Sequence, residues 1–428
     1  MPPHHLAQLG SFPASQDGAG DVVIVGAGIV GICAAALLAE AGFSVTVYDR
    51  TGVCEETSSG NASAFAFSDV LPMAHKGMIR NLPRWLADPL GPLAIRPSYL
   101  PKLLPWLWRF WRAGSPKHFE ASLAAQAAMM KLAEPEWMSL LDRSGTRHML
   151  REDGSLELYG SEAEFRASLP GWQARDRYAI PYRHIEGDEL AALQPGLSSQ
   201  FHKATFIPGW KTSIDPKLLG KAVWAYAETL GARFERREVT GAEAVQNDVT
   251  LRFSDGASTR AGRVLIAAGA WSHRLAAQLG DRIPLETERG YNTTLPVDAF
   301  DVKRQLVFPS HGFVITPLST GLRIGGAVEL GGLDLPPNYA RSKAMLEKAK
   351  RFLPGLKTEG GREWMGYRPS LPDSLPVIGR SRAPNVLYAF GHGHLGKTQA
   401  AATALLIRNL ISGEAPTIDI SPFSPQRF

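Results

Sequence analysis

The sequence lacks the features that mark several protein classes. Only two of its 428 residues are cysteines, Cys33 and Cys54, too few for a disulfide framework or a four-cysteine zinc site. A reducing cytoplasm is therefore the expected compartment. No run reaches the roughly 20 apolar residues of a membrane-spanning helix, because the richest stretch, Tyr99 to Trp111, contains two prolines, a lysine and an arginine.

Neither sign of charge dominates the sequence. Lysine and arginine number 46 against 41 aspartates and glutamates, so the net charge is only +5. This balance argues against nucleic acid as a partner and fits an anionic small molecule better. The chain is long enough for two packed cores. Residues 1–20 lack an apolar segment and are predicted to be a flexible leader, not a signal peptide.

A dinucleotide-binding pattern lies near the N-terminus. The β-branched run Val22–Val25 leads directly into the turn Gly26-Ala27-Gly28-Ile29-Val30-Gly31, and an alanine-rich helix is predicted from Ile29 to Ala41. A second strand, 44–48, ends at Asp49. This order of strand, glycine turn, helix, strand and acid predicts a βαβ unit that binds a dinucleotide.

Each part of that unit has a physical role. The glycines at 26, 28 and 31 permit a tight turn and a close approach of backbone to a pyrophosphate, and the helix N-terminus offers free N–H groups. Asp49 is placed to reach a ribose hydroxyl. The alternatives are a glycine turn without a ligand and an ordinary surface carboxylate at the end of a strand.

The C-terminal part of the sequence repeats the arrangement of strand, glycine turn and helix. A buried strand is expected within Arg263–Ser272, and another, Val386–Phe390, is followed by the glycine-rich turn Gly391–Thr398 and a helix to about Ile411. This second helix N-terminus suits an electron-rich group such as the C2 carbonyl edge of a flavin. An NAD-dependent dehydrogenase does not need these elements, so they favour FAD.

Together these motifs resemble the FAD-dependent D-amino acid oxidase superfamily. The resemblance is greatest to the small subunit of bacterial D-amino acid dehydrogenase and to its hydroxyproline-oxidising relatives. The motifs that carry it occur in order along the chain: the N-terminal glycine turn, Ser58–Ser63, Asp88–Leu93, Ala267–Ser272, and the segment from Arg368-Pro369 to Gly391-His392-Gly393.

The resemblance implies an α/β fold, with a Rossmann-like FAD-binding domain of the glutathione-reductase type and an inserted mixed-sheet (α+β) substrate domain. The expected FAD-binding pieces are residues 21–80, 206–280 and 361–428. The expected substrate-domain pieces are residues 81–205 and 281–360.

The same resemblance implies which residues hold FAD. Neither cysteine is well placed for a tether, so non-covalent binding is expected. Two positions depart from the family pattern: Asp49 replaces a glutamate, and Lys397 replaces an apolar residue. Lys397 is expected either to stabilise the reduced flavin or to point into solvent. The expected cofactor residues are Gly26, Gly28, Ile29, Val30, Gly31, Asp49, Arg50, Ser58, Ser59, Asn61, Ala62, Ser63, Val239, Ala268, Gly269, Trp271, Gly391, His392, Gly393, His394, Leu395, Gly396, Lys397 and Thr398.

Arg368, Tyr291 and His394 are the candidate catalytic residues. A guanidinium can hold an amino-acid carboxylate through two hydrogen bonds, and Arg368 occupies the matching position of the family; the alternative is a structural ion pair. Tyr291 could donate its hydroxyl to the same carboxylate, or belong to the core. His392 and His394 could tune the flavin or release a proton, or only shape the turn. Their spacing argues against a metal site.

The sequence therefore predicts an FAD-dependent oxidoreductase that acts on the C–N bond of a D-amino acid or a cyclic imino acid such as hydroxyproline. Hydride would pass from the α-carbon to flavin N5, giving an imine that is hydrolysed to a 2-oxo acid or released as a cyclic imine. Alternatives are an oxidase of glycine or sarcosine-type amines and a non-catalytic FAD-binding scaffold. The electron acceptor could be oxygen, a quinone or an electron-transfer chain.

The segment from Leu82 to Phe119 combines aromatic and basic residues. Such a mixture is typical of a surface that contacts a membrane, here the bacterial inner membrane, as in dehydrogenases of this family. The alternative is that the aromatic residues cap the substrate-domain core. The residues concerned are Trp85, Trp106, Trp108 and Trp111, the nearby Trp137, and Arg84, Arg96, Lys102, Arg109 and Arg112.

Overall fold

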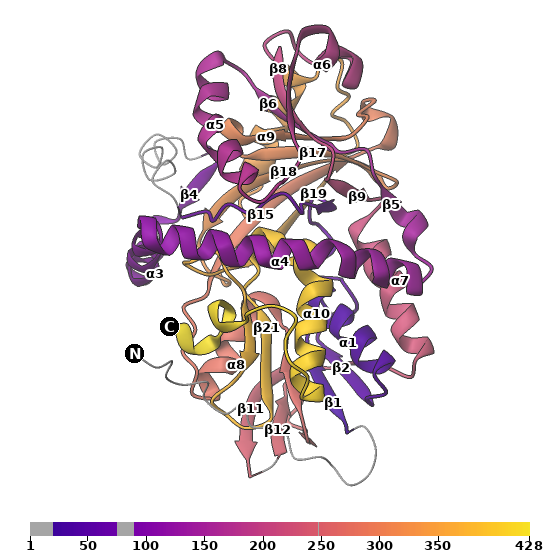
Figure 1. Cartoon of the computed structure of the whole chain (residues 1–428), viewed down its shortest axis with the longest axis vertical. Coiled ribbons are helices and arrows are strands. Elements are labelled where there is room, and N and C mark those ends of the chain that lie inside the picture. Colours follow the sequence, from indigo (N-terminus) through magenta and orange to yellow (C-terminus); the bar gives the residue numbers. More distant parts are fainter. Residues whose placement is uncertain (1–19, 75–89, 247) are drawn as a thin grey trace.

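The computed structural model describes residues 20–74, 90–246 and 248–428. Figure 1 shows two regions, each built on a sheet, with long helices crossing between them. The predicted leader, apart from Gly20, lies outside the described residues, as do Arg84, Trp85 and the first two residues of the Asp88–Leu93 motif.

The lower region in Figure 1 contains a six-stranded sheet that is parallel except at one edge. Its helices are α1 (Ile29–Glu40) and α10 (Gly396–Ser412), which pack against each other, and α7 (Pro216–Thr229). Alanine and leucine make α1 buried almost all round, as a helix between a sheet and two other helices must be. The strands in spatial order are β10 (Arg233–Arg236), β2 (Val45–Asp49), β1 (Val22–Val25), β14 (Val264–Ile266), β21 (Val386–Phe390) and β20 (Val377–Arg380).

The upper region contains a nine-stranded mixed sheet. Its two longest strands, β15 and β18, pair antiparallel beside β19 at the edge. Helices α5 (Glu162–Asp176), α6 (Gly187–Leu193) and α9 (Ala340–Phe352) accompany it, and Phe308, Phe313 and Phe352 stack in its core. The strands in order are β19 (Arg362–Ser370), β15 (Glu286–Leu295), β18 (Gly321–Leu330), β17 (Phe313–Leu318), β16 (Gln305–Phe308), β6 (Ser155–Tyr159), β8 (Lys203–Ile207) and β7 (Arg183–Glu186), with β4 (Leu93–Ile95) beside β18.

Smaller elements complete the molecule. Helix α8 (Ser272–Gln278) packs on an antiparallel meander of β11 (Val239–Val245), β12 (Asp248–Phe253) and β13 (Ser258–Ala261). A three-stranded sheet pairs β9 (Lys211–Ser213) with β3 (Ala64–Phe65) and β5 (Leu150–Arg151). Helices α3 (Leu100–Ala113) and α4 (Pro116–Arg143) run between the two regions.

The predicted strands and helices around both glycine turns are confirmed, but two elements do not follow the expected domain boundaries. Strand β19 was assigned to the FAD-binding piece 361–428, yet it pairs along its whole length with β15 of the nine-stranded sheet. Helix α4 was assigned to the substrate domain, yet Met129, Trp137 and Leu141 pack into the core formed by α1 and α10. Cross-strand pairing and packing of distant helices decided both outcomes, and neither is visible in local sequence.

Candidate active site

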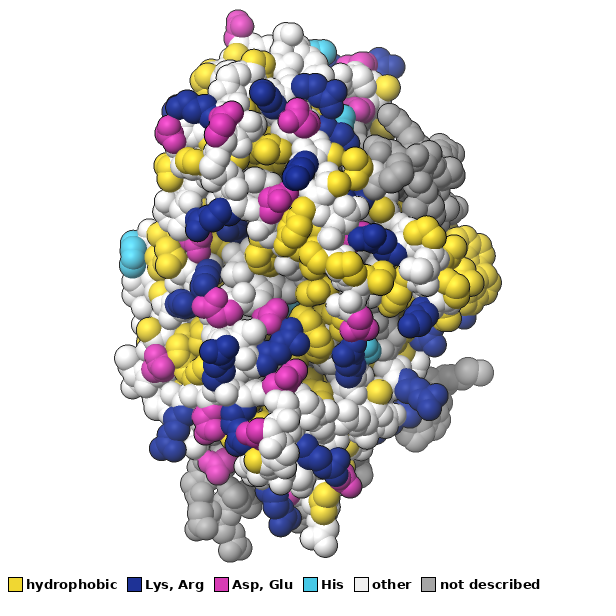
Figure 2. Space-filling model, turned by 180° about the vertical axis from the view of Figure 1, so that it is seen from behind, with side chains coloured by type: hydrophobic (Ala, Val, Ile, Leu, Met, Phe, Trp, Pro, Cys, Tyr) yellow, Lys and Arg dark blue, Asp and Glu magenta, His cyan; other side chains and the backbone are white. Residues whose placement is uncertain are grey.

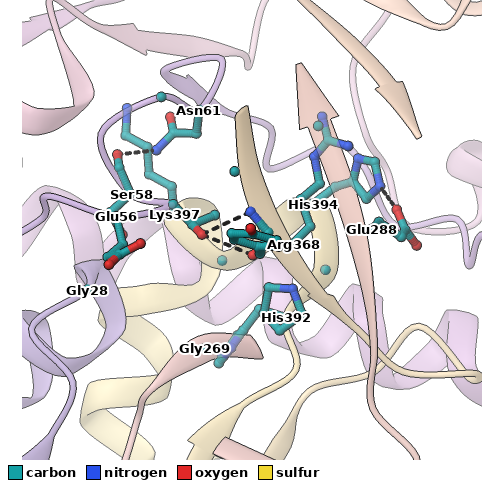
Figure 3. A pocket seen from close by; sticks show the side chains of 18 of the residues that line it. Gly28, Glu56, Ser58, Asn61, Gly269, Glu288, Arg368, His392, His394 and Lys397 are labelled. Carbon is teal, nitrogen blue, oxygen red and sulfur yellow. Dashed lines mark hydrogen bonds and ion pairs between the residues drawn. The ribbon is translucent and has the colours of Figure 1, made fainter. Parts of the chain in front are cut away.

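A cavity of about 1110 Å³ lies between the two sheets and extends from the N-terminus of α1 to strands β15, β18 and β19. Figure 3 shows its two sides: Gly28, Ser58 and Asn61 lie at one, and Arg368, His394 and Glu288 at the other. We call these the nucleotide end and the substrate end. The length and the mixed lining of the cavity suit a long ligand with one phosphate-bearing part and one flat apolar part.

Close backbone packing builds the nucleotide end. Gly26 has φ +112°, and a Cβ added there would lie 2.5 Å from the carbonyl oxygen of Ala267 on the neighbouring strand. A Cβ on Gly31 would lie 2.0 Å from the carbonyl oxygen of Gly26. Only glycine allows this approach of strand, turn and helix, as the sequence pattern predicted.

The N-terminus of α1 opens into this end of the cavity. Gly28 caps the helix without a side-chain hydrogen bond, and the backbone N–H of Ile29 donates to the hydroxyl of Ser58 at 2.9 Å. The Asp49 carboxylate accepts from the backbone N–H groups of Ala27 and Thr51 at 2.8 and 2.9 Å. Backbone donors, a hydroxyl and a carboxylate thus stand where a pyrophosphate and a ribose need them, so the residues fit a dinucleotide.

Two buried basic side chains hold the segment Ser59–Ser63 along the middle of the cavity. Arg323 donates from Nη1 to the carbonyls of Ser59 and Asn61, and Lys397 donates from Nζ to the carbonyl of Ser63 at 2.7 Å. The Lys397 ammonium also donates to Ser213 and lies 4.1 Å from the ring centre of Phe65. Burial lowers the pKa of Lys397 well below its ordinary value and that of Arg323 to about 10.

The expectation that Lys397 could point into solvent is therefore wrong, since its side chain is buried. His392 is also buried; its Nε2 lies 3.0 Å from the hydroxyl of Thr403, and burial lowers its pKa to about 3. His392 thus stays uncharged at neutral pH and serves the turn structurally. The positive φ values of Gly391 and Gly393, +85° and +54°, make this turn possible.

A β-bulge shapes the substrate end. Strand β18 has one residue more than β15 in the interval bounded by the pairs Arg289–Glu329 and Tyr291–Gly326. Within this bulge, Ala327 takes φ +56°. Its carbonyl accepts a hydrogen bond of 2.9 Å from Nη1 of Arg368, whose guanidinium lies across Gly290. The rest of the Arg368 guanidinium lines the cavity. Burial lowers the pKa of Arg368, although the negative charge of Glu288 opposes that change.

Glu288 stands opposite Arg368 in the strand register. Its side chain is 4% exposed, and its Oε2 lies 2.6 Å from Nε2 of His394. Burial alone would raise the pKa of Glu288, but the attraction and hydrogen bond of His394, a hydrogen bond from Ser370 and the charge of Arg368 outweigh it, so the pKa is lowered. Glu288 is therefore an ionised partner for His394.

Tyr291 does not direct its hydroxyl toward Arg368, in contrast to the sequence prediction. The hydroxyl donates to Glu329 and accepts from the backbone N–H of Asn338 at 3.0 Å. Tyr291 is among the residues that line the cavity, but its side chain also packs into the hydrophobic core of the nine-stranded sheet, which is the second of the two alternatives. Glu329 also binds Arg96 and Arg289, so Tyr291 belongs to a buried structural network.

Most of the predicted cofactor residues line the cavity. Five of them do not line it. The hydroxyl of Ser59 donates to backbone carbonyls, and the hydroxyl of Ser63 donates to Ser213. The hydroxyl of Thr398 accepts from the N–H of Ala66, and Gly31 and Gly391 lie behind the turns. Those on the cavity wall are Gly26, Gly28, Ile29, Val30, Asp49, Arg50, Ser58, Asn61, Ala62, Val239, Ala268, Gly269, Trp271, His392, Gly393, His394, Leu395, Gly396 and Lys397.

Sequence reasoning missed several cavity residues. Glu288, Arg323 and Ala327 were not among the candidate residues, because no sequence motif marks them. Helix α3 also contributes an apolar wall of Trp106, Leu107, Phe110 and others. Among the described residues, no group of three or more histidine, cysteine, aspartate or glutamate side chains could hold a metal ion.

Comparison with known proteins gives consistent matches. The family model described as FAD dependent oxidoreductase (DAO) matches residues 21–410. The chain is 33% identical over 418 residues to a D-amino-acid oxidase of Bradyrhizobium diazoefficiens (95% of this chain, 98% of the relative). It is 28% identical over 416 residues to a D-amino acid dehydrogenase of Neisseria meningitidis (95% and 99%).

A solved structure shares the fold. The crystal structure of glycine oxidase from Geobacillus kaustophilus superposes with a TM-score of 0.72 at 23% identity, covering 96% of this chain and 100% of the other. The predicted family resemblance, fold class and FAD cofactor are confirmed by these matches.

Proposed function

We propose that this chain, which belongs to the DAO family of FAD dependent oxidoreductases, oxidises the C–N bond of an amino acid whose carboxylate is held by Arg368. The observation that carries the proposal is a partly buried guanidinium facing the cavity, with Nη1 engaged by the Ala327 carbonyl. Bound FAD supplies the chemistry by accepting hydride from the α-carbon. The protein supplies orientation, because two hydrogen bonds from a planar fork hold the carboxylate in one plane.

We favour D-amino acids as substrates because the two relatives described above are named D-amino-acid oxidase and D-amino acid dehydrogenase. Cyclic imino acids such as hydroxyproline and glycine or sarcosine-type amines carry the same carboxylate and amine pair. The nucleotide end would hold the ADP part of FAD, with Ser58 and Asn61 beside it and the turn Gly393–Lys397 near the flavin ring.

Anaerobic bleaching of the yellow protein tests the proposal. Added D-amino acids should reduce the bound flavin, and a panel of D- and L-amino acids, proline derivatives and sarcosine identifies the preferred class. Flavin that stays oxidised with every compound would contradict the proposal and favour a non-catalytic scaffold.

Arg368→Ala tests the role of the guanidinium. It should raise KM by about 100-fold or more and leave FAD content intact, since a charge-assisted bidentate contact is lost. Arg362→Ala on the same strand, where the side chain is exposed, is the matched control. Unchanged KM in Arg368→Ala would overturn the carboxylate assignment.

We also propose that α3 contacts an anionic membrane surface. Leu104, Trp108 and Trp111 are 56, 59 and 55% exposed on one face of the helix, with Arg109 and Arg112 beside them, whereas Leu103 and Trp106 are buried. Figure 2 shows hydrophobic side chains gathered at the edge where α3 lies. Trp106 packs with Leu330 of the nine-stranded sheet, as the second sequence interpretation requires, whereas Trp137 packs into the core of α1 and α10. No described helix is long and apolar enough to cross a membrane.

Sedimentation with vesicles tests this contact. Wild-type protein should sediment with anionic vesicles and less so in high salt, and the double variant Trp108→Ser, Trp111→Ser should not. Leu218→Ser with Val297→Ser, two other exposed apolar residues, is the control. Assays with oxygen, with a soluble quinone and with a dye would then identify the electron acceptor.

A further inference from the structure

The pair of Glu288 and His394 is a feature of the cavity that neither nucleotide binding nor carboxylate binding requires. The turn Gly393–Leu395 places His394 on the cavity wall with its side chain 37% exposed, while Glu288 on β15 is almost fully buried. Figure 3 shows the two side chains joined beside Arg368. A buried carboxylate that holds a cavity-facing imidazole is an arrangement suited to moving a proton.

The hydrogen bond fixes which nitrogen of His394 is free. A carboxylate 2.6 Å from Nε2 requires a proton on that nitrogen, so Nδ1 of the neutral ring carries the lone pair. When the ring gains a proton at Nδ1, the same carboxylate stabilises the imidazolium, as in other carboxylate–histidine pairs. His394 can therefore accept one proton without losing its partner.

The other charged groups around this turn are already engaged. Arg368 on β19 faces Glu288 and bonds to Ala327. On the turn and helix of His394 itself, His392 bonds to Thr403, and Lys397 donates to Ser63 and Ser213. Asp69 pairs with Arg175. Among the described groups around this turn, His394 is therefore the one whose protonation state can change when a ligand binds beside Arg368.

The proposed substrate needs such an acceptor. At neutral pH an amino acid carries an ammonium group, which has no lone pair to assist departure of hydride from the α-carbon. We propose that His394, held by Glu288, takes one proton from the substrate ammonium and so makes the amine ready for oxidation. In this step an N–H bond of the ammonium breaks and a bond from hydrogen to Nδ1 forms. The imidazolium later returns the proton to water. The inference rests on the proposed function.

The pH dependence of turnover distinguishes this role from a structural one. His394→Asn should lower kcat/KM at about pH 7 by about 100-fold or more, because only substrate already deprotonated in solution can react. The loss should shrink about tenfold per pH unit as the pH approaches the pKa of the substrate amine. Glu288→Gln should behave in the same way, with a smaller loss. His202→Asn, an exposed histidine, is the control.

Binding of a compound that cannot react gives a second readout. 2-Aminoisobutyrate has the carboxylate and the amine but no hydrogen on its α-carbon. Calorimetry should show that wild type binds this compound less tightly as the pH is lowered, because a His394 ring that already carries a proton cannot accept one from the ammonium group, whereas the affinity of His394→Asn should lack this pH dependence. FAD content and the flavin spectrum report whether each variant is folded.

The outcomes separate the two proposals. If no amino acid reduces the flavin of the wild-type protein, the proposed function is overturned and this inference with it. A wild-type protein that turns over, together with a His394→Asn variant that loses activity equally at all pH values or keeps the pH-dependent affinity of wild type for 2-aminoisobutyrate, overturns the inference alone.

Discussion

At the nucleotide end of the cavity, Gly28, Asp49 and Ser58 come from one continuous stretch, residues 22–61, whereas Arg368, Glu288 and His394 at the substrate end come from three distant elements. The first set is arranged by local geometry, because a strand, a glycine turn and a helix must follow one another in space as they do in sequence. The second set exists only when β15, β18 and β19 have paired. The comparison teaches that cofactor binding and substrate binding should be separable by mutation.

The largest expected effect is the loss of FAD in Gly28→Val. A Cβ at this position already lies 3.4 Å from the Ser58 hydroxyl, so a branched side chain would fill the space in front of α1. Its backbone has no positive φ, so the fold should tolerate the change. FAD affinity should fall roughly 100-fold, measured by flavin absorbance after gel filtration and by titration of the apoprotein. The control is Gly262→Ala, where an added Cβ meets nothing.

Gly290→Ala should do the reverse and disturb only the substrate end. The new methyl would lie 2.3 Å from Nη2 of Arg368 and displace the guanidinium. We expect KM to rise by roughly 30-fold, about 2 kcal/mol, with normal FAD content, in steady-state assays of the purified holoenzyme. Loss of FAD in this variant would show that the two ends are not independent.

Lys397, which lies between the two ends, should make the free energy of unfolding depend on pH. Its folded pKa lies below the ordinary value of 10.5, so the native state binds fewer protons than the unfolded state, and stability rises with pH between those two values. Lys397→Met should remove this contribution, up to about 1.4 kcal/mol per pH unit. Urea unfolding followed by circular dichroism between about pH 7 and 9 measures it, with the exposed Lys343→Met as control. Parallel curves for wild type and Lys397→Met would refute the lowered pKa of Lys397.

The smallest effect is expected for Ser58→Ala. The variant loses the hydroxyl that accepts from Ile29 N–H but keeps the backbone of the turn. The dissociation constant of FAD should rise about fivefold, corresponding to about 1 kcal/mol, with KM for substrate unchanged. Fluorescence quenching of free FAD by apoprotein provides the measurement. An effect as large as that of Gly28→Val would mean that the hydroxyl, and not the helix N-terminus, dominates binding.

How far the site could be predicted depended on where each residue's neighbours lie. Gly26, Gly28 and Asp49 were predicted from their own surroundings, because they belong to one short βαβ unit in which the φ of +112° at Gly26 and the bond from Thr51 N–H to Asp49 are local features. Arg368 was found through family resemblance, since its partner, the Ala327 carbonyl, is exposed to it only by the bulge in β18. For Tyr291 the sequence left a carboxylate contact and a core position open, and only the structure decided for the core, because a period of two does not say which face of the sheet a side chain packs on.

The sequence by itself determined the βαβ unit and the second strand and helix at the C-terminus, because these follow from short-range sterics and hydrogen bonding. It indicated FAD as the cofactor through the family resemblance. Only the tertiary structure decided that Glu288 holds His394, that Lys397 is buried and that β19 joins the nine-stranded sheet. Those results depend on strand register and on the burial of charge, which arise when segments far apart in the chain pack against one another.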